Sequence, residues 1–192
     1  MKARTWSVLL AVLTLVGGGA VWRESWRVWP PDPHVDRNLS DAALPVIDRF
    51  LEAGGAVVWP SSMPGRMRPR WFCTESVIET VQRGASQVRV SLEVACNDYA
   101  RDGGRLVTHA GVRTPLLATL DRKGAALAVR DVAEPLDGAG FRPSLERMFS
   151  GRAIAEYDRR QRRDSGVDAP DAEAARAFGL PPGTGAQQFQ AP

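Results

Sequence analysis

The alternation of hydrophobic and polar positions is clearest in the middle of the chain. In residues 86–97 every second side chain is apolar, which predicts a strand with one buried face and one solvent face. The apolar members of this run are Val88, Val90, Leu92, Val94 and Cys96. Similar runs predict strands at 71–82, 105–120 and 125–134. Because the connections between these four runs are short, an antiparallel meander is expected.

A helical period precedes the strands. Residues 40–55 (SDAALPVIDRFLEAGG) place apolar side chains on one stripe, which predicts an amphipathic helix. The stripe consists of Leu44, Ile47, Phe50 and Leu51. Ser40 or Asp41 can cap this helix, and Pro45 is tolerated when it lies close to the first turn. Gly54 and Gly55 then end it.

The chain becomes helical again after the last strand. Residues 144–149 (SLERMF) and 150–163 (SGRAIAEYDRRQRR) predict two short helices, so the expected fold class is α+β: a helix, a curved four-stranded antiparallel meander and short C-terminal helices. Residues 164–192 are rich in Gly, Pro, Ala and Gln and are expected to form a flexible tail, with at most one helical turn at DAEAARAF.

The first 22 residues have the composition of an export segment. Lys2 and Arg4 precede an apolar run, and the residues from Thr5 to Trp22 are all uncharged. This length is at the lower limit for a transmembrane helix, while the small residues up to Ala20 fit a signal peptide cleaved after that position. Both interpretations remain open. In either case the remainder is expected outside the cytosol, as a single-pass membrane protein or in secreted form.

The domain boundaries follow from these segments. Residues 23–38 form a predicted stalk rich in Pro and Trp, and residues 39–163 form one exported α+β domain. The sequence contains 25 basic and 22 acidic residues, for a net charge of +3, which does not predict binding to nucleic acid.

The two cysteines permit a specific structural prediction. If Gly84 and Ala85 form a two-residue turn, the turn fixes the register of the first two strands. In that register Cys73 lies directly opposite Cys96. In an oxidising compartment we expect a disulfide there, with two free buried thiols as the alternative. The same register puts Glu75 and Glu79 on the apolar face. A bulge in the strand or a shifted turn is therefore an alternative to this register.

A loop at residues 60–70 carries the candidate interaction residues. Arg66, Arg68 and Arg70 are followed by Trp71, a combination that suits a protein partner in the cell envelope, or anionic headgroups or wall polymers. The alternative interpretation is that the aromatic residues only pack the loop against the domain.

No catalytic motif is present. His109 and Asp98 are the weak candidates for a pocket on the concave face of the sheet, and a structural histidine is the alternative. The stretch GLPPGTGAQ (179–187) lacks the lysine and the Ser/Thr of a phosphate-binding loop, so no nucleotide is expected. No cofactor is expected, and no His or Cys cluster has the spacing of a metal site. We do not expect an enzyme.

The order of one helix, four strands and the stretch EPLDGAGFRPSLERMF (134–149) resembles exported, membrane-anchored hypothetical proteins of actinobacteria with a cystatin-like domain of the nuclear transport factor 2-like superfamily. The resemblance implies a cone-shaped sheet around the helix, and it assigns no functional residue. Members of the superfamily include pocket enzymes, ligand binders and membrane-anchored assembly factors of type IV secretion machines. We expect a non-enzymatic binding domain at the cell envelope. The alternatives are a small ligand binder or enzyme that uses the concave sheet face, and an assembly component of a secretion or conjugation apparatus.

Overall fold

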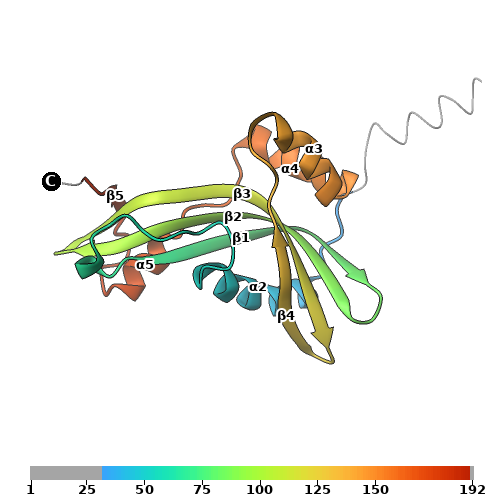
Figure 1. The fold of residues 1–192 in the computed structure, drawn as a ribbon, viewed down its shortest axis with the longest axis horizontal. Helices are drawn as coiled ribbons and strands as arrows, with labels where there is room; N and C mark the ends of the chain where they lie inside the picture. The colour runs from blue at the N-terminus through green and yellow to red at the C-terminus, as the bar shows by residue number, and fades with distance from the viewer. Residues whose placement is uncertain (1–31, 191–192) are drawn as a thin grey trace, which may run out of the picture. The chain divides into compact units, whose positions relative to one another are not determined.

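The computed structural model describes residues 32–190. The chain divides into two units, residues 1–32 and 33–192, and all the elements below lie in the second. This unit is α+β, with a mixed five-stranded sheet and four α-helices among the described residues (Figure 1). The elements are α2 (Arg37–Glu52), the 3₁₀ turn η1 (Gly65–Met67), β1 (Arg70–Arg83), β2 (Gln87–Asp102), β3 (Arg105–Lys123), β4 (Ala126–Ala133), the 3₁₀ turn η2 (Gly138–Gly140), α3 (Phe141–Met148), α4 (Gly151–Arg163), α5 (Asp171–Ala177) and β5 (Ala186–Gln188).

The sheet is an antiparallel meander with one added strand. Its order is β1-β2-β3-β4, which confirms the four predicted strands. The short strand β5 pairs in parallel with the beginning of β3, at Leu106–Thr108, whereas β4 pairs with the end of β3 from Leu117 onward. The sequence did not predict β5, because three residues are too few to show an alternating pattern.

Helix α2 begins three residues earlier than predicted. Asp36, and neither Ser40 nor Asp41, is the N-cap, since its side chain accepts a hydrogen bond from the amide of Leu39 at 3.1 Å. Pro45 consequently lies in the helix interior, where its ring removes one backbone hydrogen bond. The fully buried stripe of the helix, which packs on the sheet, consists of Ala43, Ile47 and Leu51.

The two faces of the sheet are covered by different helices. Helix α2 packs against one face, and α3 and α4 lie over the opposite one (Figure 1). Under α2 the sheet contributes a continuous apolar layer, made of Val88, Val90, Leu92, Val94, Cys96, Leu116, Ala118 and Leu120. The concave sheet face, on which a pocket was considered from the sequence, is therefore filled by side chains of α2 and the sheet.

The second face of β2 is not exposed to solvent as its alternating pattern predicted. Ser91 and Glu93 are only 5% and 1% exposed, because α3 and α4 cover them. The carboxylate of Glu93 accepts hydrogen bonds from Arg113 on β3 and Gln161 on α4. Glu93 can occupy this layer because one of its carboxylate oxygens is bonded to these two side chains.

The β1–β2 hairpin differs from the predicted one in two compensating ways. Its loop has three residues, 84–86, since Arg83 pairs with Gln87. A bulge at Ile78 then shifts the register by one residue. The bulge turns Glu79 to the α3–α4 face, opposite Ser91, whereas Glu75 stays on the α2 face. The predicted two-residue turn is wrong, but the bulge restores the facing pairs beyond it.

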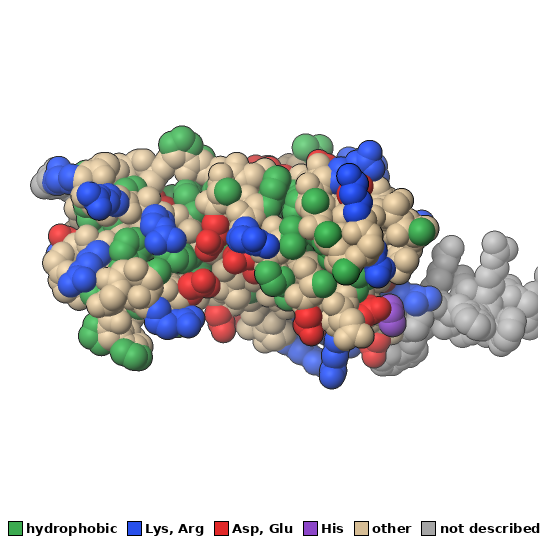
Figure 2. Space-filling view, turned by 90° about the horizontal axis from the view of Figure 1, so that it is seen from below, with side chains coloured by type: hydrophobic (Ala, Val, Ile, Leu, Met, Phe, Trp, Pro, Cys, Tyr) green, Lys and Arg blue, Asp and Glu red, His purple; other side chains and the backbone are tan. Residues whose placement is uncertain are grey.

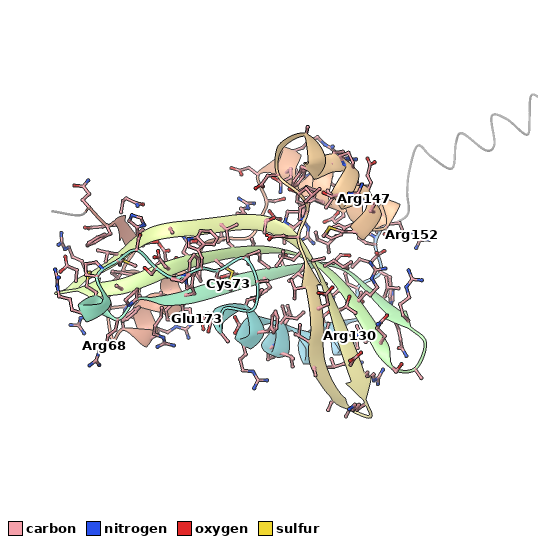
Figure 3. The ribbon with its side chains drawn as sticks, in the orientation of Figure 1. Arg68, Cys73, Arg130, Arg147, Arg152 and Glu173 are labelled. Carbon is pink, nitrogen blue, oxygen red and sulfur yellow. A yellow bond between two sulfur atoms is a disulfide. The ribbon has the colours of Figure 1, made fainter. Side chains whose placement is uncertain are left out.

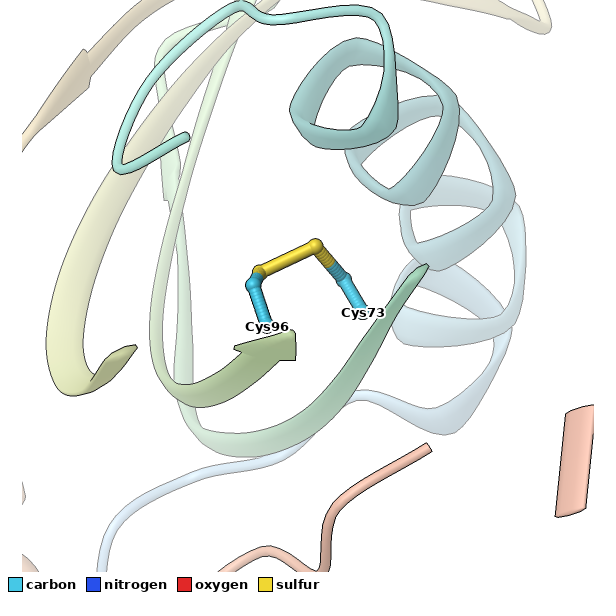
Figure 4. Close-up of a disulfide and its surroundings, with 2 residues drawn as sticks. All are labelled: Cys73 and Cys96. Carbon is cyan, nitrogen blue, oxygen red and sulfur yellow. A yellow bond between two sulfur atoms is a disulfide. The ribbon is translucent and has the colours of Figure 1, made fainter. Parts of the chain in front are cut away.

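The disulfide between Cys73 and Cys96 is confirmed. The two residues are direct partners in the β1–β2 ladder, with Cα atoms 4.1 Å apart, as in a pair that exchanges no backbone hydrogen bonds. Both side chains are buried on the face that α2 covers (Figure 4). The bond therefore joins the two strands inside the main core.

The segment from Asp164 onward, which composition predicts to be a flexible tail, contributes to the core. Helix α5 contains the DAEAARA stretch and buries Ala174 and Ala175. These residues pack with Leu180 against side chains of β1, β2 and β3, namely Phe72, Tyr99 and Leu106. A few small apolar residues are sufficient here because large aromatic side chains of the sheet cover them.

The predictions for residues 1–22 and for most of the stalk lie outside the described residues. The stalk predicted at 23–38 ends before Arg37, which begins α2. Within residues 32–190, the helices are too short or too polar to cross a bilayer.

Candidate functional site

The loop between α2 and β1 is fixed to the sheet by two serines. The Ser61 hydroxyl donates to the carboxylate of Asp98 at 2.6 Å. The Ser62 hydroxyl forms a hydrogen bond of 2.9 Å with Nδ1 of His109. Between them and η1, Met63 is 3% exposed and belongs to a small core cluster. The loop that carries the predicted interaction residues is thus held in one position.

The structure separates the predicted interaction residues. Arg66 and Arg68 are exposed at η1 and form no ion pair among residues 32–190 (Figure 3 labels Arg68). The guanidinium of Arg70 lies over the ring of Phe72, 5.0 Å from its centroid, in a cation–π contact. Because side chains alternate along β1, Trp71 points to the opposite face from Arg70. Only Arg66 and Arg68 are unpaired cations of the predicted set.

Trp71 forms a fixed aromatic pair with Trp59. Its Nε1 donates a hydrogen bond of 2.8 Å to the Trp59 carbonyl, and the two rings lie edge to face with centroids 5.2 Å apart. Trp59 is 48% exposed, which makes it one of three exposed large hydrophobic residues in the described part of the chain. The pair flanks the loop that carries Arg66 and Arg68.

Asp98 has a structural role that its sequence position does not reveal. It is fully buried at an irregularity of the β2–β3 ladder, between Asn97 and Tyr99. One carboxylate oxygen accepts hydrogen bonds from the backbone amides of His109 and Ala110, at 2.9 and 2.7 Å. The carboxylate therefore satisfies two amides that the register shift removes from the ladder.

His109 lies close to Asp98 in the structure, but its ring contacts other groups. The imidazole bonds to Ser62 and packs edge to face on Phe189, with centroids 6.3 Å apart. No described side chain orients the ring from its other nitrogen. Serine and histidine are adjacent, but the third group that positions the base in a nucleophilic triad is missing here.

A group of carboxylates gathers where α2, β1 and α5 meet. It consists of Asp48, Glu52, Glu75 and Glu173, and Figure 2 shows acidic side chains clustered on this face (Glu173 is labelled in Figure 3). Burial, and after it the charges of the neighbouring carboxylates, together raise the pKa of Glu75 to about 8. Burial also raises the pKa values of Asp48 and Glu52. Among residues 32–190, no His, Cys, Asp and Glu side chains are grouped so as to hold a metal ion.

A cavity between the sheet and the α3–α4 junction was not expected from the sequence. It contains Glu79 and several arginines that are far apart in the chain. The single sequence observation that bears on it is the misfit of Glu79 on the apolar face in the predicted register. The sequence could not place the bulge at Ile78, because nothing in the residue pattern marks one position of β1 as inserted.

Comparisons with known proteins find no relative. No protein-family model matches the chain, and neither curated proteins nor solved structures give a significant match. Arguments about function therefore rest on the residues and the geometry described above.

Proposed function

We propose that this protein is a non-enzymatic binding domain of the cell envelope, and that it binds an acidic surface of a partner protein through Trp59, Arg66 and Arg68. The observation that supports the proposal most directly is the aromatic pair of Trp59 and Trp71, which fixes an exposed indole at the base of the loop that carries two exposed, unpaired arginines. Trp and Arg are the side chains that most often dominate the binding energy of protein interfaces.

The rigidity of the loop favours a protein partner. Hydrogen bonds from Ser61 and Ser62 hold the loop, and the indole of Trp71 is itself bonded to the backbone of residue 59. A fixed surface loses little conformational entropy on binding, so more of the contact energy appears as affinity. The two guanidinium groups are complementary to carboxylates on a partner.

A lipid surface is less well supported. Insertion into a bilayer needs apolar side chains at the tip of the loop, but the tip holds Arg66 and Arg68, and Met67 packs inward. Two or three arginines alone contribute only about 1 kcal/mol each near an anionic membrane. The alternative of a pocket enzyme is also weaker, since α2 fills the sheet face that such a pocket would use.

The location is part of the proposal. The buried disulfide suits an oxidising compartment, which supports export by the N-terminal segment, either as a single-pass membrane protein or in secreted form after cleavage. We further propose that the fold is of the cystatin-like type, on the basis of the order of α2 and the four-stranded meander. A periplasmic or extracellular reporter fused at the C-terminus should be active; activity of only a cytosolic reporter would contradict export.

The partner can be tested by site-specific photo-cross-linking in living cells. A photoreactive phenylalanine derivative is introduced at Trp59 and, as a matched control, at Leu136, which is 61% exposed and lies elsewhere in the chain. We expect a discrete adduct only from position 59. It should weaken with Arg66→Ala and Arg68→Ala and with increasing salt, and the cross-linked peptide should come from an acidic surface.

The control variant for these arginines is Arg130→Ala, an exposed arginine on β4 that pairs with Asp121. It should leave the adduct unchanged. Equal adducts from positions 59 and 136, or binding of the full chain to anionic vesicles that depends on the same two arginines, would contradict a protein partner.

A further inference from the structure

The cavity beside the α3–α4 junction is lined by side chains of opposite charge. It has a volume of about 190 Å³ and lies between the ends of β1 and β2 and the segment that joins α3 to α4. Its polar lining residues are Glu79, Arg83, Arg89, Ser91, Arg147 and Ser150. Figure 3 labels Arg147 beside these two helices, on the side of the sheet away from α2.

Glu79 is the unusual member of this lining. It is only 5% exposed, and among residues 32–190 no donor reaches its carboxylate by a hydrogen bond or an ion pair. The bulge at Ile78 turns this side chain into the cavity; with a regular register it would lie under α2. The carboxylate faces the cavity without a donor from the protein, so a group that supplies donors there would gain charge-assisted hydrogen bonds.

The other side of the cavity is positive. Arg83 and Arg147 are exposed at its rim and form no ion pair in the described part of the chain. Arg89 is half-buried, and its guanidinium is held by the Met148 carbonyl at 3.2 Å. These groups would favour an anion at the rim, opposite the buried carboxylate.

The N-terminus of α4 adds to this positive region. Ser150 caps the helix by accepting a hydrogen bond from the Ala153 amide at 3.1 Å, and Ser150 lines the cavity. The first turn of this 13-residue helix contains no acidic residue and includes Arg152. The partial positive charge of the helix end is therefore not neutralised from within the helix.

From these observations we propose that the cavity binds a free α-amino acid, with its ammonium group on Glu79 and its carboxylate toward Arg147 and the start of α4. A simple anion would leave Glu79 unpaired, and a simple cation would be repelled by three arginines. A zwitterion satisfies both sides. The volume lies below the 300–1,000 Å³ or so of pockets for drug-sized ligands, which suits one amino acid better than a peptide. Val81, Leu117 and Phe149 offer apolar contact to a short side chain.

The test uses the full chain, purified in detergent at neutral pH. Each of the twenty amino acids is screened for a rise in the melting temperature, and each hit is measured by isothermal titration calorimetry. We expect at least one amino acid to bind. Its N-acetyl derivative, which lacks the ammonium charge, and its methyl ester, which lacks the carboxylate, should each bind at least tenfold more weakly.

Glu79→Gln separates a binding role from a structural one. It should weaken binding at least tenfold, yet leave the ligand-free protein at least as stable as the wild type, because no hydrogen bond or ion pair of Glu79 is lost. Glu134→Gln, an exposed glutamate outside the cavity, is the matched control and should change neither quantity. Arg147→Ala should weaken binding several-fold.

Three results would overturn the proposal. One is that no amino acid raises the melting temperature or gives heat of binding. Another is that the N-acetyl derivative, or glycerol 3-phosphate, binds as tightly as the best amino acid. The last is that Glu79→Gln binds the amino acid as the wild type does. None of these results bears on the surface around Trp59, which lies on another part of the domain.

Discussion

Cys73 of β1 and Cys96 of β2 are direct cross-strand partners, and their disulfide lies in the core beneath α2. The bond joins the edge strand of the sheet to its neighbour, on the face where Ile47 and Leu51 pack. An edge strand is hydrogen-bonded to a neighbouring strand on one side only. The covalent bond to β2 therefore adds to the interactions that hold β1 in the sheet.

Removal of this bond should destabilise the domain. With 23 residues of sequence separation, restriction of the unfolded chain gives a contribution of about 3 kcal/mol. We expect the Cys73→Ala/Cys96→Ala variant to unfold at a correspondingly lower urea concentration. The measurement is equilibrium unfolding with and without reductant. Reductant should lower the midpoint of the wild type and leave that of the double variant unchanged; equal midpoints for both proteins without reductant would contradict a stabilising bond.

The strands were predictable to within a few residues because their alternation depends on local sequence alone. The geometry of the β1–β2 hairpin was not predictable in this way, because the three-residue turn and the bulge at Ile78 shift the register in opposite directions. Their effects cancel at Cys73 and Cys96, so the correct pairing followed from an incorrect turn. The effects do not cancel at Glu79. The face of the sheet on which this side chain lies could therefore be determined only from the structure.

The carboxylate group around Glu75 should make stability depend on pH. The pKa of Glu75 is about 8 in the folded state, above its ordinary value near 4.5, because burial and the charges of Asp48, Glu52 and Glu173 disfavour ionisation. A raised folded pKa means that the folded state binds more protons than the unfolded state between these two values. The contribution is fully present below about pH 4.5 and is lost as pH rises through about 8.

Glu75→Gln should abolish most of this dependence. Since one pKa unit corresponds to about 1.4 kcal/mol, and neighbouring groups share the effect, we expect a gain on the order of 2 kcal/mol at pH 9 and little change at pH 5. Urea unfolding at both pH values measures it. Glu134→Gln serves as the exposed control. A variant that is destabilised equally at both pH values would show that the carboxylate is ionised and paired in the folded state.

Asp98→Ala should be among the most destabilising single changes in the domain. The variant leaves the amides of His109 and Ala110 and the hydroxyl of Ser61 without their acceptor, in a fully buried position. Loss of a buried charged acceptor with several donors costs about 3 kcal/mol. Asp102→Ala removes an exposed carboxylate near the end of the same strand and should cost less than about 0.5 kcal/mol. Similar losses for both variants would remove the structural role assigned to Asp98.

The candidate residues show which part of a site can be obtained from sequence. Arg66 and Arg68 were found because a loop with three closely spaced arginines can be recognised from its composition alone. The structural role of Asp98 could not be predicted from the sequence, because it depends on a register irregularity that brings two amides of β3 to one carboxylate. The cavity around Glu79 was missed for a similar reason, since its lining comes from three strands and a helix junction.

The C-terminal segment should be held in place by the contact between Tyr99 and Asp171. The Tyr99 hydroxyl donates to the Asp171 carboxylate at 2.6 Å, and the other carboxylate oxygen accepts from the amide of Ala186, which begins β5. Asp171→Ala therefore releases both β5 and a fully buried tyrosine hydroxyl, at a cost of about 2 kcal/mol.

The consequence is testable by limited proteolysis followed by mass spectrometry of the fragments. In Asp171→Ala we expect rapid cleavage after Asp164 or later, whereas the wild type resists it. Tyr99→Phe should show partial release, and the double variant should be less destabilised than the sum of the two single variants, because both remove the same hydrogen bond. Additive losses, or a wild-type segment that is cleaved as fast as that of the variant, would show that α5 and β5 are held by their apolar contacts with Phe72 and Leu106 alone.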